Sequence, residues 1–312
     1  MITNEQAPGL VFNEILNAAA ESLLSEGGSG STFGLSGNIL ISDTKDPLPY
    51  ILKDVEPLIG APDLYAGGSA GILARWDRGT RSLTLKVDEA GIRLSLQDVA
   101  TLDAAETPMR RSGVGRTPGW VPSHRDLPYL WQIYQGPERT TPSVPPTRDW
   151  KQLEASLGAL LLVWAEQIPL LFGTEGSEEV ACNLINQADD EQIMVILQSR
   201  DDGLLLLLDD RRSPATQTDA QTMFGRGWHE MIPVLGAWKA AFEPSPDSAA
   251  EAAKLAVNEL RLRGAASPLD IAVTDLSKTK HGRLLLPGLP LPQVQASRSC
   301  RSGNRQRDMK IH

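Results

Sequence analysis

The chain has 312 residues, 41% hydrophobic side chains and a formal net charge of −9, which suits about two domains with packed cores. No uninterrupted apolar stretch reaches the ~18 residues of a membrane helix, and no basic segment followed by an apolar one opens the chain, so we expect neither a span nor a secretory signal. Its two cysteines, Cys182 and Cys300, are too few for a disulfide framework and favour a cytoplasmic protein.

The first region, residues 1–135, is predicted to be an α+β domain. Apolar side chains at helical spacing indicate a helix from Leu10 to Ser25 and a short one from Pro47 to Ile59, interrupted by Pro49 and ended near Pro57. A further helix is expected from Gln97 to Thr107. Between these helices, alternating segments separated by turn residues predict an antiparallel meander: Ile72–Asp77, Ser82–Val87 and Ile92–Leu96.

A linker is expected at residues 136–148, because GPERTTPSVPPT is rich in proline and offers few side chains to bury. The second domain, residues 149–276, opens with large apolar residues at helical spacing, which predict a core-facing helix from Asp149 to Gln167. Three strands are predicted after this helix: Glu179–Ile185, Gln192–Gln198 and Leu204–Leu208. Antiparallel sheets with helices packed on them, in two tandem units, are therefore the expected architecture.

The segment Leu204–Leu208 is apolar at every position. A strand with apolar side chains on both faces must be covered on both, either by helices of its own chain or by a partner. The sequence leaves these two alternatives open.

Two helices are predicted after these strands. A short one covers Asp219–Met223, and a long one rich in alanine begins at Ser248, which has the Ser-x-x-Glu spacing of a capping box with Glu251, and ends near Gly264. Small side chains on one face of this helix permit close packing against a sheet or another helix.

The tail, residues 277–312, combines a proline-rich spacer with a basic segment and is expected to be disordered. From Lys278 onward it holds eight basic residues, Lys278, Lys280, Arg283, Arg298, Arg301, Arg305, Arg307 and Lys310, against the single acid Asp308. Its final segment contains no aromatic residue that could stack on a base, so we do not expect it to bind nucleic acid.

The second domain resembles the actinobacterial proteins grouped as type III secretion chaperone and YbjN-like (TY-Chap) domains. The resemblance covers about Asp149–Ala272 and rests on the opening helix from Trp150, the three strands, Gly227-Trp228 with Pro233, Trp238, and AAKLAVNELRLRGAASPLDI from Ala252. It departs from the family at Leu-Arg-Leu-Arg-Gly, where a more acidic turn is expected, and at Gly236-Ala237 before Trp238. The resemblance implies an α+β fold, chaperone-like binding of a peptide or protein, and no catalytic residues.

No constellation of residues indicates catalysis, and we expect a protein that is not an enzyme and holds neither cofactor nor metal. His229-Glu230 lacks the second histidine of a His-Glu-x-x-His metal motif. A weaker alternative is a hydrolase that uses carboxylates of the acidic turns, Asp201, Asp202, Asp209 and Asp210, for acid–base chemistry.

The sequence thus favours a chaperone-like protein that holds a polypeptide segment on an apolar sheet or groove, by apolar burial or by strand addition. The residues expected to contact the partner are Trp164, Leu204, Leu206, Leu208, Trp228 and Trp238. The alternative is a homodimeric structural or regulatory module that uses the same surface. Packing of these six residues in the core is the third interpretation left open.

Overall fold

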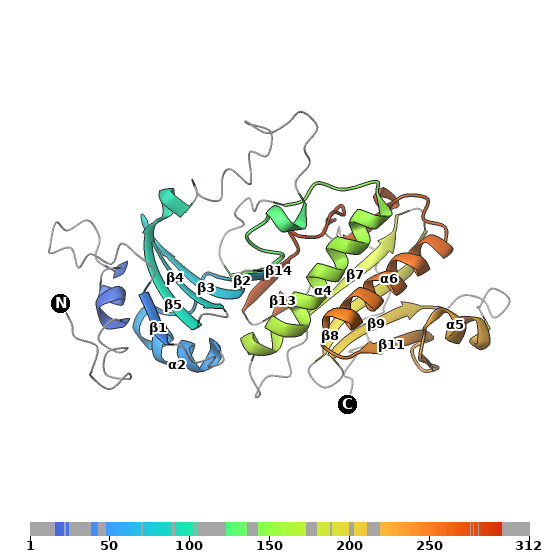
Figure 1. The fold of residues 1–312 in the computed structure, drawn as a ribbon, viewed down its shortest axis with the longest axis horizontal. Coiled ribbons are helices and arrows are strands. Elements are labelled where there is room, and N and C mark those ends of the chain that lie inside the picture. Colours follow the sequence, from blue (N-terminus) through green and yellow to red (C-terminus); the bar gives the residue numbers. More distant parts are fainter. Residues whose placement is uncertain are drawn as a thin grey trace, which may run out of the picture.

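The computed structural model describes residues 16–21, 23–24, 39–42, 48–69, 71–88, 91–102, 104, 123–135, 143–172, 180–187, 189–199, 203–210, 219–274, 276, 278–279 and 281–294. These residues form an α+β fold with two antiparallel sheets and helices packed on them, as the sequence predicted. Helix α4 (Trp150–Phe172) lies between the two sheets (Figure 1).

The first sheet has eight strands in the spatial order β1, β5, β4, β3, β2, β6, β14, β13. Their bounds are β1 Ile39–Ser42, β2 Leu64–Gly68, β3 Gly71–Arg78, β4 Arg81–Asp88, β5 Gly91–Asp98, β6 Trp131–Tyr134, β13 Lys278–Thr279 and β14 Gly282–Leu285. The predicted meander is confirmed as β3, β4 and β5, and each strand is slightly longer than its alternating core.

Helix α2 (Leu48–Ile59) shares one hydrophobic cluster with the inward-facing residues of this meander. The predicted interruption at Pro49 is wrong, and Pro57 lies inside the last turn rather than ending the helix early. Of the first predicted helix, the structure describes residues 16–21 and 23–24, which are helical. The helix expected from Gln97 begins later than predicted, because β5 extends through Asp98; its described helical residues are 99–102 and 104.

The C-terminal part of the chain returns to the first sheet. Strand β14 pairs with β6, with Leu284 opposite Ile133, and Leu284 is fully buried. The tail expected to be disordered from residue 277 is therefore structured through residue 294, because its leucines fill the core despite the prolines between them; residues 295–312 lie outside the described part. Residues of the expected linker take part in the same region, since the backbone N–H of Val144 donates to the Pro287 carbonyl.

The second sheet has six strands in the order β10, β11, β9, β8, β7, β12. Their bounds are β7 Val180–Asn186, β8 Asp189–Ser199, β9 Gly203–Asp209, β10 Glu230–Ile232, β11 Ala237–Phe242 and β12 Ile271–Thr274. The three strands predicted by the sequence are the central β7, β8 and β9, which pair antiparallel in chain order, with a register shift between β7 and β8 at Ile185/Asn186.

Helix α4 is longer than predicted and ends at Phe172, with Pro169 inside its last turn. The Asp149 carboxylate accepts from the backbone N–H of Lys151 at 2.9 Å, which stabilises the first turn. Within the described residues α4 alone is long and apolar enough to cross a membrane; Lys151, Glu154 and Glu166 interrupt its apolar sequence, and more than half of its most apolar stretch is buried inside the protein.

Two further helices pack with the second sheet, and the longer one lies beside α4 on the same face of that sheet. In α5 (Ala220–Arg226), the Asp219 side chain caps the first turn by accepting from the Thr222 N–H. Helix α6 (Pro246–Leu262) begins two residues earlier than predicted: its cap is Ser245 rather than Ser248, and Pro246 occupies the first helical position, where no N–H is needed. Its alanines lie against α4: a Cβ on Gly158 of α4 would be 3.7 Å from the Ala253 Cβ.

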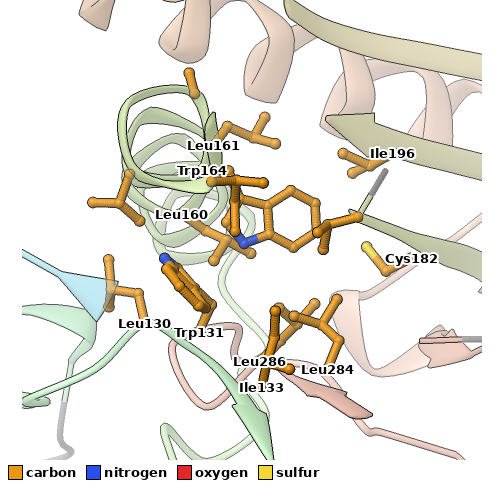
Figure 2. Close-up of a cluster of buried hydrophobic side chains, with 14 of the residues drawn as sticks. Leu130, Trp131, Ile133, Leu160, Leu161, Trp164, Cys182, Ile196, Leu284 and Leu286 are labelled. Atoms are coloured by element: carbon orange, nitrogen blue, oxygen red, sulfur yellow. The ribbon is translucent and has the colours of Figure 1, made fainter. Parts of the chain in front are cut away.

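The hydrophobic core is continuous across both sheets. Figure 2 shows Trp164 of α4 between Trp131, Ile133 and Leu284 of the first sheet and Cys182 and Ile196 of the second. The sheets therefore share one core through α4.

Candidate functional site

The six residues expected to contact a partner all lie in this core. None of these side chains is more than 3% exposed: Trp164, Leu204, Leu206, Leu208, Trp228 and Trp238. The leucines occupy the face of β9 that α4 and α6 cover. These side chains pack the protein interior, and a partner cannot contact them while the core is closed.

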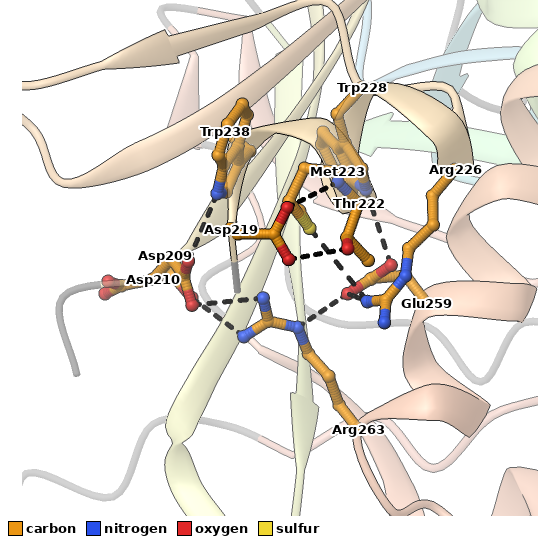
Figure 3. A network of polar contacts seen from close by, with 10 residues as sticks. All are labelled: Asp209, Asp210, Asp219, Thr222, Met223, Arg226, Trp228, Trp238, Glu259 and Arg263. Carbon is orange, nitrogen blue, oxygen red and sulfur yellow. Dashed lines mark hydrogen bonds and ion pairs between the residues drawn. The ribbon is translucent and has the colours of Figure 1, made fainter. Parts of the chain in front are cut away.

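Trp228 and Trp238 belong to a buried network of polar contacts (Figure 3). The indole N–H of Trp238 donates to Asp210 at 3.1 Å, and that of Trp228 donates to Glu259 at 3.4 Å. Arg263 joins the two carboxylates, with its Nη2 3.2 Å from Asp210 Oδ1 and its Nε 2.8 Å from Glu259 Oε1.

The contacts of this network indicate that Asp210 stabilises the fold rather than acting in catalysis. Its carboxylate is 2% exposed and is engaged by a guanidinium and an indole, so it lacks the access to substrate that acid–base chemistry requires. Asp201 and Asp202, the other carboxylates of the hydrolase alternative, lie outside the described residues. Asp209 precedes Asp210 at the end of β9 and is partly exposed.

The opposite face of the six-stranded sheet carries a second set of apolar side chains. We call it the outer face and define it by Leu205, Leu207, Val195, Ile185, Ala181 and Ala241. Leu205 is 7% exposed, and the other five are partly exposed. They alternate with the buried residues along β7, β9 and β11, and the register sets Leu207 beside Val195 and Leu205 beside Ala241. Helices α4 and α6 lie on the inner face, and in the described part of the chain no helix forms a layer on the outer one.

The edges of this sheet differ in accessibility. At β12, the Val273 N–H donates to the Pro292 carbonyl and its carbonyl accepts from the Val294 N–H, so residues 292–294 already occupy the edge. At the other edge, β10 has three residues. A partner strand could therefore form few backbone hydrogen bonds at either edge of this sheet.

A cleft of about 680 Å³ lies where α4 crosses the end of the first sheet. We call it the basic cleft. Its polar wall is formed by Lys86 of β4, Arg93 of β5, and His124 and Arg125 of the short helix η1 (His124–Asp126). Its apolar wall is formed by Leu130, Ala159, Leu162 and Val163. Glu166 is the one carboxylate among the described residues that line it.

Gln167 fixes the width of the basic cleft. Its amide donates to the Gly68 carbonyl at 2.7 Å and accepts from the Trp131 indole at 3.2 Å, which ties α4 to β2 and β6. Gly67 permits this contact, because a Cβ there would lie 2.6 Å from the Trp131 ring and would also collide with Gln167 Oε1.

Burial sets the charge of His124 in the same cleft. Partial burial, reinforced by the adjacent Arg125, lowers the pKa of His124 below its usual value near 6.5, against a smaller opposing effect of Asp126. Its Nδ1 lies 3.1 Å from the Ser156 hydroxyl. His124 is therefore predominantly neutral at pH 7, and Lys86, Arg93 and Arg125 carry the positive charge.

Cys182 offers no nucleophile, because burial raises the pKa of its thiol to about 12 and keeps it protonated. Among the residues that the structure describes, no three His, Cys, Asp or Glu side chains gather as a metal site would require.

Comparison with known proteins gives no match, whether to family models, to curated proteins or to solved structures. The TY-Chap resemblance therefore stays a prediction.

The sequence did not indicate the basic cleft, since its cations come from separate segments that only the fold brings together. The outer face was signalled by the apolar run of β9, whose odd-numbered leucines point away from the helices.

Proposed function

We propose that this protein binds a polypeptide segment of a partner on the outer face of its six-stranded sheet and that it does so without catalysing a reaction. The observation that carries the proposal is the group of partly exposed apolar side chains on this face, which includes Leu207, its cross-strand neighbour Val195, and Ile185. This binding surface replaces the six core residues that the sequence suggested.

The layering of the second sheet supports this proposal. A sheet buries each apolar face against another element, and here α4 and α6 cover the inner face alone. The outer face spans six strands at a spacing of about 4.8 Å, so it is wide enough for a helix of about 10 Å diameter. We infer that the partner contributes an amphipathic helix as the third layer.

The edges of the sheet favour binding to its face over strand addition. Residues 292–294 occupy the β12 edge, and β10 is too short for a long ladder. Among the described side chains, the charges on the outer face, Glu230, Lys239 and Asp209, lie toward its β10 side, and the polar Asn183 of β7 lies beside Val195. An apolar centre with polar residues on either side suits a partner segment that has one apolar stripe.

The proposal agrees with the chaperone-like binding that the TY-Chap resemblance implies. A second copy of the chain could cover the same face, which is the homodimer alternative. Measurement of the oligomeric state distinguishes a homodimer from a complex with a different partner.

Thiol labelling of single-cysteine variants tests the proposal. In a Cys300→Ser background the remaining Cys182 is buried and protonated, so a maleimide reports on Leu207→Cys. The probe is a designed amphipathic helical peptide of leucine, lysine and glutamate, compared with a scrambled peptide of the same composition. Leu206→Cys serves as the inner-face control and Lys254→Cys, on the exposed side of α6, as the accessible control.

We expect Leu207→Cys to be labelled readily and to be protected by the amphipathic peptide but not by the scrambled one. Leu206→Cys should stay unlabelled, and Lys254→Cys should react equally with and without peptide. Absence of protection at any peptide concentration contradicts the proposal. Protection that instead rises with protein concentration, together with a dimer in light scattering, would establish the homodimer alternative in its place.

A further inference from the structure

We propose that a cleft at the C-terminal end of α6 is a binding site for a small molecule that joins an aromatic ring to a carboxylate. We call it the α6 cleft. It has a volume of about 590 Å³, and Trp150 of α4 and Arg226 of α5 line it together with residues of α6. Because α6 covers the inner face of the second sheet, this site is separate from the outer face, and the inference does not depend on the proposed polypeptide binding.

The aromatic ring of the ligand is assigned to the apolar surface of the α6 cleft. Leu255 is 7% exposed, whereas Leu262, two turns later on the same helix, is 61% exposed. Trp150 is partly buried and packs against the core from the other side of the cleft. A ligand with an apolar body would remove Leu262 and the indole from water, which is favourable in proportion to the apolar area that it covers.

Arg261 favours a flat ring over a flexible chain. Its guanidinium carbon lies 5.8 Å from the centroid of the Trp150 ring, so a cation–π contact holds the planar guanidinium beside the indole. Guanidinium groups also stack on the aromatic rings of ligands. Trp150 and Arg261 therefore offer two planar surfaces in one cleft, and an aromatic ligand covers such surfaces better than an alkyl chain does.

The carboxylate of the ligand is assigned to the two arginines. In the described part of the chain, no carboxylate pairs with Arg261 and its side chain donates no hydrogen bond. Arg226 contacts its described neighbours through Nη1 alone, which lies 3.3 Å from Glu259 Oε1 and 3.9 Å from Met223 Sδ. Both guanidinium groups thus keep N–H donors for a ligand, and a guanidinium can bind a carboxylate through two parallel hydrogen bonds.

Glu259 also lines the α6 cleft, but its contacts lie within the protein. Its side chain is 1% exposed, and Nε of Arg263 lies 2.8 Å from its Oε1 while the indole of Trp228 donates to its Oε2 at 3.4 Å. Among the described lining residues, two arginines therefore face one carboxylate that is already bound from inside. This excess of positive charge favours an anionic ligand over a neutral one.

The size and rigidity of the α6 cleft suit a small molecule. Its volume of about 590 Å³ falls within the roughly 300–1,000 Å³ of ligand pockets. The close packing of Gly158 against Ala253 fixes α4 relative to α6, and the Asp149 cap fixes the first turn of α4, where Trp150 lies. The site is therefore formed before the ligand arrives, and preformed sites lose less entropy on binding.

Isothermal titration calorimetry of the full chain tests the inference. The probe is 2-naphthoate. Naphthalene-2-carboxamide keeps the ring without the charge, heptanoate carries the charge on a flexible chain, and acetate is the carboxylate alone. The variants are Arg261→Gln, which removes the unpaired guanidinium, and Leu262→Asn, which makes the exposed apolar position polar. Arg125→Gln, at an exposed arginine of η1 outside the α6 cleft, is the matched control for loss of a cation.

We expect 2-naphthoate to bind about 10-fold or more tightly than the carboxamide or acetate, because only 2-naphthoate combines the ring with charge-assisted hydrogen bonds. It should also bind more tightly than heptanoate. Arg261→Gln should weaken its binding by about 10-fold or more, as the loss of a hydrogen bond to a charged group implies. Leu262→Asn should weaken it as well, and Arg125→Gln should not.

The inference is overturned if 2-naphthoate does not bind the wild-type chain, if the carboxamide or heptanoate binds as tightly, or if Arg261→Gln binds like wild type. The thermal midpoint of each variant without ligand shows that it is folded. Failure here leaves protection of Leu207→Cys unaffected, so the two proposals fall separately.

Discussion

Nε of Arg263 lies 2.8 Å from Oε1 of Glu259, one turn earlier on α6, and only 1% of the Glu259 side chain is exposed. The same guanidinium donates to Asp210 at the end of β9. Arg263 therefore pairs with two buried carboxylates from different elements and connects α6 to the end of strand β9.

Replacing Arg263 with methionine should lower the free energy of unfolding by about 3 kcal/mol or more, because it removes the guanidinium that two buried carboxylates share, and loss of one member of a buried ion pair is strongly destabilising. Urea denaturation measures this change. Arg226→Met is the matched control: Arg226 also pairs with Glu259 but its side chain is 30% exposed, so its loss should cost about 1 kcal/mol or less. Equal costs for the two variants would contradict the buried role of Arg263.

Gly67→Ala should destabilise the protein by about 1–3 kcal/mol, the usual cost of overpacking, because its Cβ would lie 2.6 Å from the Trp131 ring. A shift of the thermal midpoint reports this cost. In contrast, Gly225→Ala places a Cβ where no atom lies within 4 Å, near the end of α5, and should be neutral or stabilising by up to about 1 kcal/mol. A neutral Gly67→Ala would show that the contact of α4 with β2 is loose.

Adjacent leucines of β9 should differ in their importance for stability. Leu206→Ala, on the inner face, should cost about 2–5 kcal/mol, since Leu206 is 1% exposed. Leu207→Ala, on the outer face, should cost about 1 kcal/mol or less, as for a partly exposed site without special contacts. Chemical denaturation of both variants checks this, and a large cost at Leu207 would mean that the outer face is covered in the free protein.

His124 should make stability depend on pH below neutrality. Burial lowers the pKa of His124 in the folded protein, so the unfolded chain binds more protons as the pH falls through about 6.5. The contribution of His124 is present above that pH and is lost below it. We expect the urea midpoint of His124→Gln to decline less than that of wild type between pH 7 and pH 5; parallel curves would contradict the buried environment.

Local patterns in the sequence predicted three strands of each sheet. The alternation in β3, β4 and β5, the apolar segments of β7, β8 and β9, and the large apolar residues of α4 gave the correct elements, because each signal lies within one segment. Strand β2, with the sequence LYAGG, was missed because its alanine and glycines have low strand propensity, and its partners β3 and β6 stabilise it. Strand β14 was missed for a related reason: its partner β6 lies about 150 residues earlier.

The candidate sites could be predicted even less well. Apolar composition alone cannot say which face of β9 a helix covers, so the sequence did not distinguish Leu206 from Leu207. The positions of α4 and α6 in the fold show that Leu206 lies on the covered face. Lys86, Arg93 and Arg125 come from three segments and form no sequence motif. Only their positions in the folded sheet and in η1 bring them to one cleft.

The pairing of β14 with β6 also sets the order in which the chain can fold during synthesis. The second sheet and its helices are encoded between these two strands, so they can assemble while the first sheet still lacks its last partners. Until residues 282–285 leave the ribosome, β6 has an unpaired edge, and exposed edges invite association with other chains. A chain truncated before β14 should therefore aggregate through its N-terminal half, even though every residue of that half is present.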